Sequence, residues 1–94
     1  MGDLRIIIDD LRERLNQLPK IDSRSGEDVM DQHRVHRAAA QKLGEYLTET
    51  YGALVRERSD ANSITMKKIR SSSTGGLHGA FRNWIAAAER RIEQ

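Results

Sequence analysis

Apolar side chains near the amino terminus recur at the spacing of an α-helix. Leu4, Ile8, Leu11 and Leu15 follow one another at intervals of four, three and four residues, an a/d heptad pattern. The chain's single proline comes soon afterwards and disfavours a helical conformation for the residue before it. We therefore predict a helix over residues 3–18. Its stripe fits either the core face of a helical bundle or a contact with a dimer mate or another partner.

Two further segments show the same period. Residues 26–58 and residues 77–93 are each predicted to form a helix, because apolar positions recur every three or four residues. Gly44 and Gly52 weaken the first of these, each by about 1 kcal/mol relative to alanine, and a break near Tyr51 is expected. The stripe positions are Val29, His33, His36, Ala40, Leu43, Leu47, Thr50 and Leu54 in one, and Leu77, Phe81, Trp84, Ala88 and Ile92 in the other.

The chain between these two helices has the composition of turns around one short helix. Residues 60–63 are turn formers, and Ser63 is a good N-cap for a helix over residues 64–71. A run of Ser, Thr and Gly over residues 71–76 then stops it. No strand alternation stands out. The expected fold is all-α: residues 1–94 form a single all-helical domain, a small four-helix bundle containing a helix-turn-helix-like corner.

Composition indicates an intracellular location. Cysteine is absent from the 94 residues, whereas a small secreted domain with a modest core usually carries disulfides. No apolar run approaches the roughly 20 residues that span a bilayer. Asp9 and Asp10 interrupt any signal-peptide core near the amino terminus. We therefore expect a cytoplasmic protein without membrane contact.

Charge is distributed unevenly along the chain. Residues 1–31 hold 5 Lys/Arg against 8 Asp/Glu, a net charge of −3, and residues 32–94 hold 11 against 6, a net charge of +5. Between Asp60 and Glu89 there is no carboxylate at all. A one-sided basic patch is typical of proteins that contact phosphates, although a solvated basic face has the same composition.

Residues 64–85 have the outline of a helix-turn-helix. In such a motif the second helix enters the major groove, and small residues at its start let the backbone approach a phosphate. We expect the cations of this segment to converge on one surface beside the start of the last helix. A bundle corner with a serine-rich loop is the alternative. The predicted nucleic-acid-binding residues are Thr65, Lys67, Lys68, Arg70, Thr74, His78 and Arg82.

Part of this region resembles a known family. Residues 64–70, the glycine pair at 75–76, and the aromatic residues Phe81 and Trp84 are similar to the amino-terminal DNA-binding region of plasmid KfrA-type regulators. The resemblance covers residues 36–88. It implies a DNA-binding protein of a mobile element. The residues that it places nearest the DNA are Thr65, Lys67, Thr74, His78 and Arg82.

Other chemistry receives less support from the sequence. His33 and His36 have the spacing of a metal pair, but both occupy stripe positions, so a structural role is favoured and no metal is predicted. Asp9, Asp10 and Glu13 alternate with arginines, as solvated ion-paired carboxylates do. No nucleophile–base pair or phosphate loop is present. We predict neither an enzyme nor a cofactor.

Two functions fit these observations. The first is a dimeric DNA-binding regulator of transcription, encoded by a plasmid or phage, which binds double-stranded DNA through the basic helix-turn-helix. Its dimer or partner contact would be Leu4, Ile8, Leu11 and Leu15. The second is a small helical protein–protein interaction module, an adapter or inhibitor whose acidic residues 1–31 bind a host or phage protein. The first predicts an affinity that falls steeply with salt.

Overall fold

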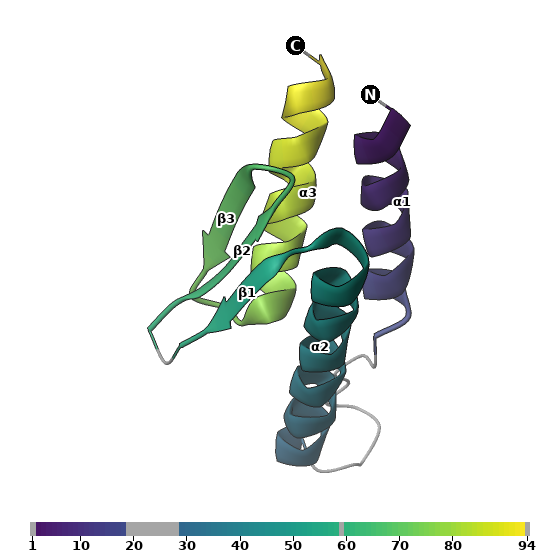
Figure 1. Ribbon diagram of the computed structural model, residues 1–94. Helices are drawn as coiled ribbons and strands as arrows, with labels where there is room; N and C mark the ends of the chain where they lie inside the picture. Colours follow the sequence, from purple (N-terminus) through teal and green to yellow (C-terminus); the bar gives the residue numbers. More distant parts are fainter. Residues whose placement is uncertain (1, 19–28, 59, 94) are drawn as a thin grey trace.

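The computed structural model describes residues 2–18, 29–58 and 60–93. Three helices lie on one side of a three-stranded antiparallel sheet, which has the strand order β1-β2-β3 (Figure 1). The elements are α1 (Gly2–Asn16), α2 (Val29–Tyr51), β1 (Leu54–Glu57), β2 (Asn62–Met66), β3 (Ile69–Ser73) and α3 (Leu77–Glu93). The molecule is thus a two-layer arrangement of helices on a sheet.

The predicted all-α fold class is therefore wrong. The short helix predicted over residues 64–71 is absent, and those residues form the end of β2, a turn and most of β3. Burial in β2 alternates with period two: Asn62, Ile64 and Met66 are buried, while the two residues between them are half-buried. That is the period of a strand with one covered face, and it outweighs helix propensity in so short a segment.

The second predicted helix also ends earlier than expected. It stops at Tyr51 instead of residue 58, at the break expected near Gly52. Gly52 has φ +71, the left-handed conformation that glycine adopts at helix ends, and its N–H donates to the Thr48 carbonyl at 3.0 Å. The chain can then reverse and enter β1. The expected helix start at residues 26–28 lies outside the described residues.

The hairpin between β2 and β3 has an uncommon turn. Its two central residues, Lys67 and Lys68, have φ values of 54° and 66°. Positive φ at both positions is the requirement of a type I′ turn, which usually contains Asn-Gly. An L-residue other than Gly, Asn or Asp pays about 1–2 kcal/mol in this conformation. Because the two residues are lysines and not Asn-Gly, the sequence gives no signal of this turn.

The core lies between the sheet and the helices. Phe81 and Trp84 of α3 are completely buried, and the indole N–H of Trp84 donates to the Met66 carbonyl at 3.0 Å. α1 runs beside α3 (Figure 1). Phe81 and Trp84 thereby fix α3 to the middle strand, β2, and α1 covers the other side of α3.

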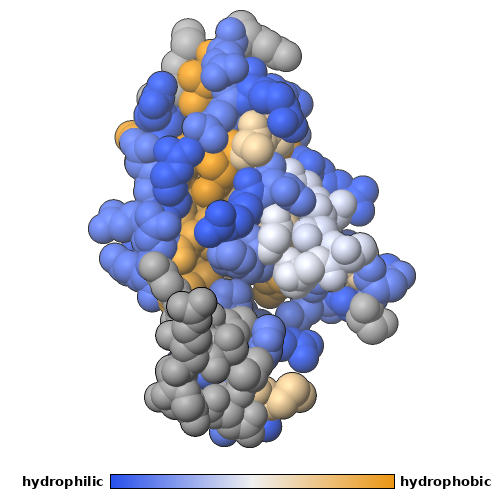
Figure 2. All heavy atoms as spheres, turned by 180° about the vertical axis from the view of Figure 1, so that it is seen from behind, coloured by the Kyte–Doolittle hydropathy of each residue, from blue (hydrophilic) through white to orange (hydrophobic). Residues whose placement is uncertain are grey.

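The apolar stripe of α1 belongs to this core. Ile8, Leu11 and Leu15 are buried within the chain, and Leu4 packs against them while partly exposed. The stripe therefore acts as an intramolecular core face, and its burial leaves these four side chains little surface for the expected dimer or partner contact. On the rear of the molecule, a strip of apolar surface shows between hydrophilic flanks (Figure 2).

None of the described helices combines the length and apolar character needed to cross a membrane.

Candidate nucleic-acid interface

One face of the sheet is left uncovered by the helices. Ile64 and Met66 point toward α3, so Ser63 and Thr65, which alternate with them, point the other way. Strand register extends this face across the sheet, because paired residues share a side. One row is Arg56, Ser63 and Ser72, and the next is Leu54, Thr65 and Arg70. We call these six residues the open face.

The open face is basic and contains no carboxylate. Arg56 and Arg70 are exposed on its two outer strands, and Lys67 and Lys68 are exposed at the hairpin tip beside it. Within residues 2–18, 29–58 and 60–93, none of the four forms an ion pair. Their charge is therefore uncompensated, as it is in surfaces that attract phosphates.

Four of the seven predicted nucleic-acid-binding residues come together on this hairpin. Thr65 and Arg70 face each other across the β2–β3 pair, and Lys67 and Lys68 connect the two strands. They are neighbours because of strand pairing, and the short helix over residues 64–71 that was expected to carry them is absent. A hairpin thus brings these four residues together where a helix was expected.

The other three predicted residues lie elsewhere. Thr74 is exposed in the loop before α3, and His78 and Arg82 occupy the first turns of that helix, in the helical layer. The Nε of Arg82 donates to the Nε2 of His78 at 3.1 Å. Arg82 also lines a groove between α1 and α3 together with Leu15. The cations therefore do not converge beside the start of the last helix, contrary to expectation.

Sequence reasoning missed Arg56, Ser63, Ser72 and Leu54. β1 was assigned to the second helix, which concealed Arg56 as a surface cation of a strand. The alternation through Ile64 and its neighbours was the signal that could have revealed the sheet.

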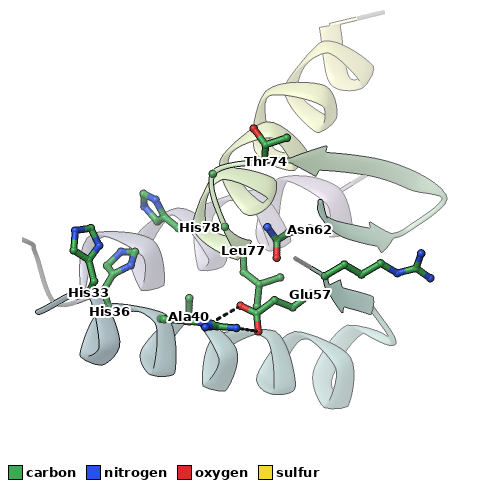
Figure 3. A pocket seen from close by; sticks show the side chains of 12 residues that line it. His33, His36, Ala40, Glu57, Asn62, Thr74, Leu77 and His78 are labelled. Carbon is green, nitrogen blue, oxygen red and sulfur yellow. Dashed lines mark hydrogen bonds and ion pairs between the residues drawn. The ribbon is translucent and has the colours of Figure 1, made fainter. Parts of the chain in front are cut away.

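A second polar region lies on the helical side. All three histidines of the chain line one pocket between α2 and the start of α3, with His33 exposed and His36 half-buried (Figure 3). The rings of His36 and His78 meet edge to face, with centroids 5.0 Å apart. Burial lowers the pKa of His78, and the charges of Arg82 and His36 lower it further. Over the described ranges, no cluster of three or more His, Asp and Glu side chains is arranged to hold a metal ion.

Glu57 of β1 lines this pocket and is bonded to side chains of α2. Its carboxylate accepts hydrogen bonds from the Nε of Arg37 at 3.2 Å and from the side-chain amide of Gln41 at 2.6 Å. The hydrogen bond from Arg37, followed by that from Gln41, lowers the pKa of Glu57. β1 is thus fastened to α2 by an ionised carboxylate, and Glu57 is turned away from the open face.

The acidic segment invoked for a protein-interaction module is described only in part, because residues 19–28 lie outside the described ranges.

Comparisons with known proteins add no family. No protein-family model matches the chain, and neither a curated protein nor a solved structure matches it. Where the resemblance to KfrA-type regulators implies a helix, over residues 64–70, the chain forms a hairpin.

Proposed function

We propose that this chain binds double-stranded DNA through the open face of its sheet. The observation that carries the proposal is the group of four cations around that face, none with an ion pair among the described residues. Contacts from Lys and Arg to phosphates supply most of the sequence-independent affinity of DNA-binding proteins. Serine and threonine hydroxyls, such as Ser63, Thr65 and Ser72, also donate to phosphate oxygens and base edges.

The strained hairpin tip supports the same function. Lys67 and Lys68 hold positive φ angles that asparagine and glycine adopt at lower cost. Strained backbone conformations cluster at functional sites, where the side chain at that position has a use. Two lysines at an exposed tip supply two mobile positive charges beside the sheet, which suits contact with a phosphate backbone.

The separation of the outer strands is comparable to the width of a DNA groove. Neighbouring strands lie about 4.8 Å apart, so the outer strands of three are separated by about 10 Å. The major groove is about 12 Å wide, and several known readers place strands in a groove. In that pose Arg56 and Arg70, on the outer strands, lie nearest the phosphates at the groove edges. Thr65, on the middle strand, lies nearest the bases.

Fluorescence anisotropy with a labelled random-sequence duplex tests the proposal. The logarithm of the binding constant should fall with the logarithm of salt concentration with a slope of about −3 to −4, because four phosphate contacts release counterions. Lys67→Gln/Lys68→Gln should reduce the steepness by about 2. The matched control is Arg90→Gln/Arg91→Gln, which removes two exposed cations from the far end of α3.

Two results would contradict this function. One is the absence of binding at tens of micromolar protein in low salt. The other is an equal loss of affinity in the lysine and arginine double variants, which would indicate attraction to net charge without a defined surface.

A further inference from the structure

The pocket between α2 and the start of α3 is a separate feature of the molecule (Figure 3). Its volume is about 380 Å³, within the range of about 300–1,000 Å³ found for small-molecule sites. It lies on the helical side of the sheet and shares no residue with the open face. Binding of a ligand in this pocket is therefore a separate question from DNA binding by the open face.

Asn62 is an unusual part of the pocket wall. Its side chain is buried, with 6% of the residue exposed. The Nδ2 donates to the Ser73 carbonyl at 3.4 Å, and the Oδ1 accepts no hydrogen bond from the described residues. Figure 3 shows this oxygen directed toward α2. Buried acceptors in proteins are nearly always satisfied, so this one calls for a hydrogen-bond donor from an occupant.

The start of α3 forms another wall. The first hydrogen bond of the helix runs from Ala80 N–H to the Gly76 carbonyl at 3.3 Å, so the amides of Leu77 and His78 precede the helical ladder. Both residues line the pocket. Free amides and the positive end of the dipole of a 17-residue helix together favour an anion.

Side-chain charge in the pocket also favours an anion. Arg37 and Arg58 line it against the single carboxylate of Glu57, and that carboxylate is already bound by Arg37 and Gln41. Arg58 forms no ion pair within the described part of the chain. One positive charge is therefore left over before any histidine is protonated.

We propose that this pocket binds a small phosphorylated metabolite that also carries a hydroxyl or amino group. Its phosphate accepts hydrogen bonds from the amides at the start of α3, and Arg58 adds positive charge at the wall of the pocket. Its hydroxyl or amino group donates to the Oδ1 of Asn62. The site thus requires two chemical features at once, which distinguishes it from a simple anion site.

Chemical-shift titration of the ¹⁵N-labelled chain tests this with three probes: glucose 6-phosphate, inorganic phosphate and glucose. Glucose 6-phosphate should give saturable shifts at the backbone amides of Leu77 and His78 and at the side-chain amide of Asn62. Its affinity should exceed that of inorganic phosphate by about tenfold, the effect of one added hydrogen bond to a buried group. Glucose should give no saturable shift.

Variants assign the two ends of the site. Arg58→Gln should weaken binding of glucose 6-phosphate by about tenfold. Arg91→Gln, an exposed position on the last turn of α3, is the matched control and should leave it unchanged. Asn62→Leu should abolish the preference for glucose 6-phosphate over inorganic phosphate while phosphate still binds.

The proposal is overturned if glucose 6-phosphate gives no saturable shift in the pocket. It is also overturned if both phosphates bind with equal affinity, or if the shifts centre on Lys67 and Lys68. Should Asn62→Leu fail to fold, the three-probe comparison and the two arginine variants decide the matter alone.

Discussion

The hydroxyl of Tyr51 and the carboxylate of Asp10 lie 2.6 Å apart and join the last residue of α2 to the middle of α1. The same carboxylate oxygen accepts from the hydroxyl of Tyr46, also at 2.6 Å, and the other accepts from the Nε of Arg14 at 2.8 Å. Burial opposes ionisation of Asp10, but these hydrogen bonds outweigh it and lower its pKa. Burial, with the bond to Asp10, raises the pKa of Tyr51.

Asp10→Asn should therefore destabilise the fold. The substitution removes the charge that two tyrosine hydroxyls donate to, and hydrogen bonds to charged groups contribute about 1.5–3 kcal/mol. We expect the free energy of unfolding to fall by about 2 kcal/mol, measured by urea denaturation. Asp9→Asn, at the neighbouring exposed position, is the control and should change it little. Equal losses in the two variants would show that the contact with the tyrosines contributes nothing.

Stability should decline in two stages as the pH falls. Burial, followed by the charges of Arg82 and His36, lowers the pKa of His78, so below its ordinary value of about 6.5 the unfolded chain takes up this proton first. The pKa values of Asp10 and Glu57 are also lowered, so their contribution is present above about pH 5 and lost below it. Urea denaturation at successive pH values measures both stages.

Variants separate the two stages. His78→Gln should flatten the decline between about pH 7 and 5, because the residue that titrates there is gone. Asp10→Asn should leave that decline in place and make the one below pH 5 shallower, with the part due to Glu57 remaining. A His78→Gln chain whose stability still declines as steeply between pH 7 and 5 would show that another group is responsible.

The sequence predicted elements where a stripe of apolar residues is long and regular. The helix over residues 77–93 corresponds to α3, because the stripe from Leu77 through Phe81 and Trp84 to Ile92 keeps helical spacing for just over four turns. The hairpin was missed because its strands have five residues each and its turn is Lys67–Lys68. Turns are recognised in a sequence by residues such as Asn and Gly. Lysines stand in their place here, so the sequence does not indicate a turn.

Relieving the strain at this turn should stabilise the protein and weaken DNA binding together. Lys67→Asn/Lys68→Gly supplies residues suited to positive φ and should raise the free energy of unfolding by about 1–2 kcal/mol, measured by urea denaturation. The same variant removes two cations, so its duplex affinity should fall. Lys67→Gln/Lys68→Gln separates the effects, because it removes the charges and keeps the strain. If Lys67→Asn/Lys68→Gly raised the free energy of unfolding and left the duplex affinity unchanged, the result would contradict a role for the hairpin tip in binding.

Gly79, in the first turn of α3, should not tolerate a side chain. A Cβ added there would collide with the Oγ of Ser73 and lie 3.1 Å from its Cβ. Gly79→Ala should therefore destabilise the fold by about 1–3 kcal/mol, as overpacked substitutions do. At Gly75 the nearest atom to an added Cβ is 3.5 Å away, so Gly75→Ala is the milder control. Thermal unfolding of the two variants measures the difference, and equal melting temperatures would show that Ser73 yields freely.

The candidate interface was predictable in composition but not in shape. The carboxylate-free segment drew attention to Lys67, Lys68 and Arg70, which share one hairpin. Arg82 lies in the same segment yet belongs to another layer, because three residues after β3 the chain turns into α3. Arg56 lies before the segment and joins the face through pairing with Ser63. Strand register, which is a long-range property, made this selection.

Comparison of Arg56 with Arg82 separates the sheet-face mode from the helix-based one. If the sheet binds DNA, Arg56→Gln should reduce the steepness of the salt dependence by about 1, since one phosphate contact is lost. Arg82→Gln should leave it unchanged, because its guanidinium donates to His78 in the helical layer. Both side chains are exposed, so neither change should disturb folding. Anisotropy titrations at four or more salt concentrations would resolve the two slopes. The reverse result, with Arg82→Gln the weaker binder, would place the DNA against α3 and exclude the open face.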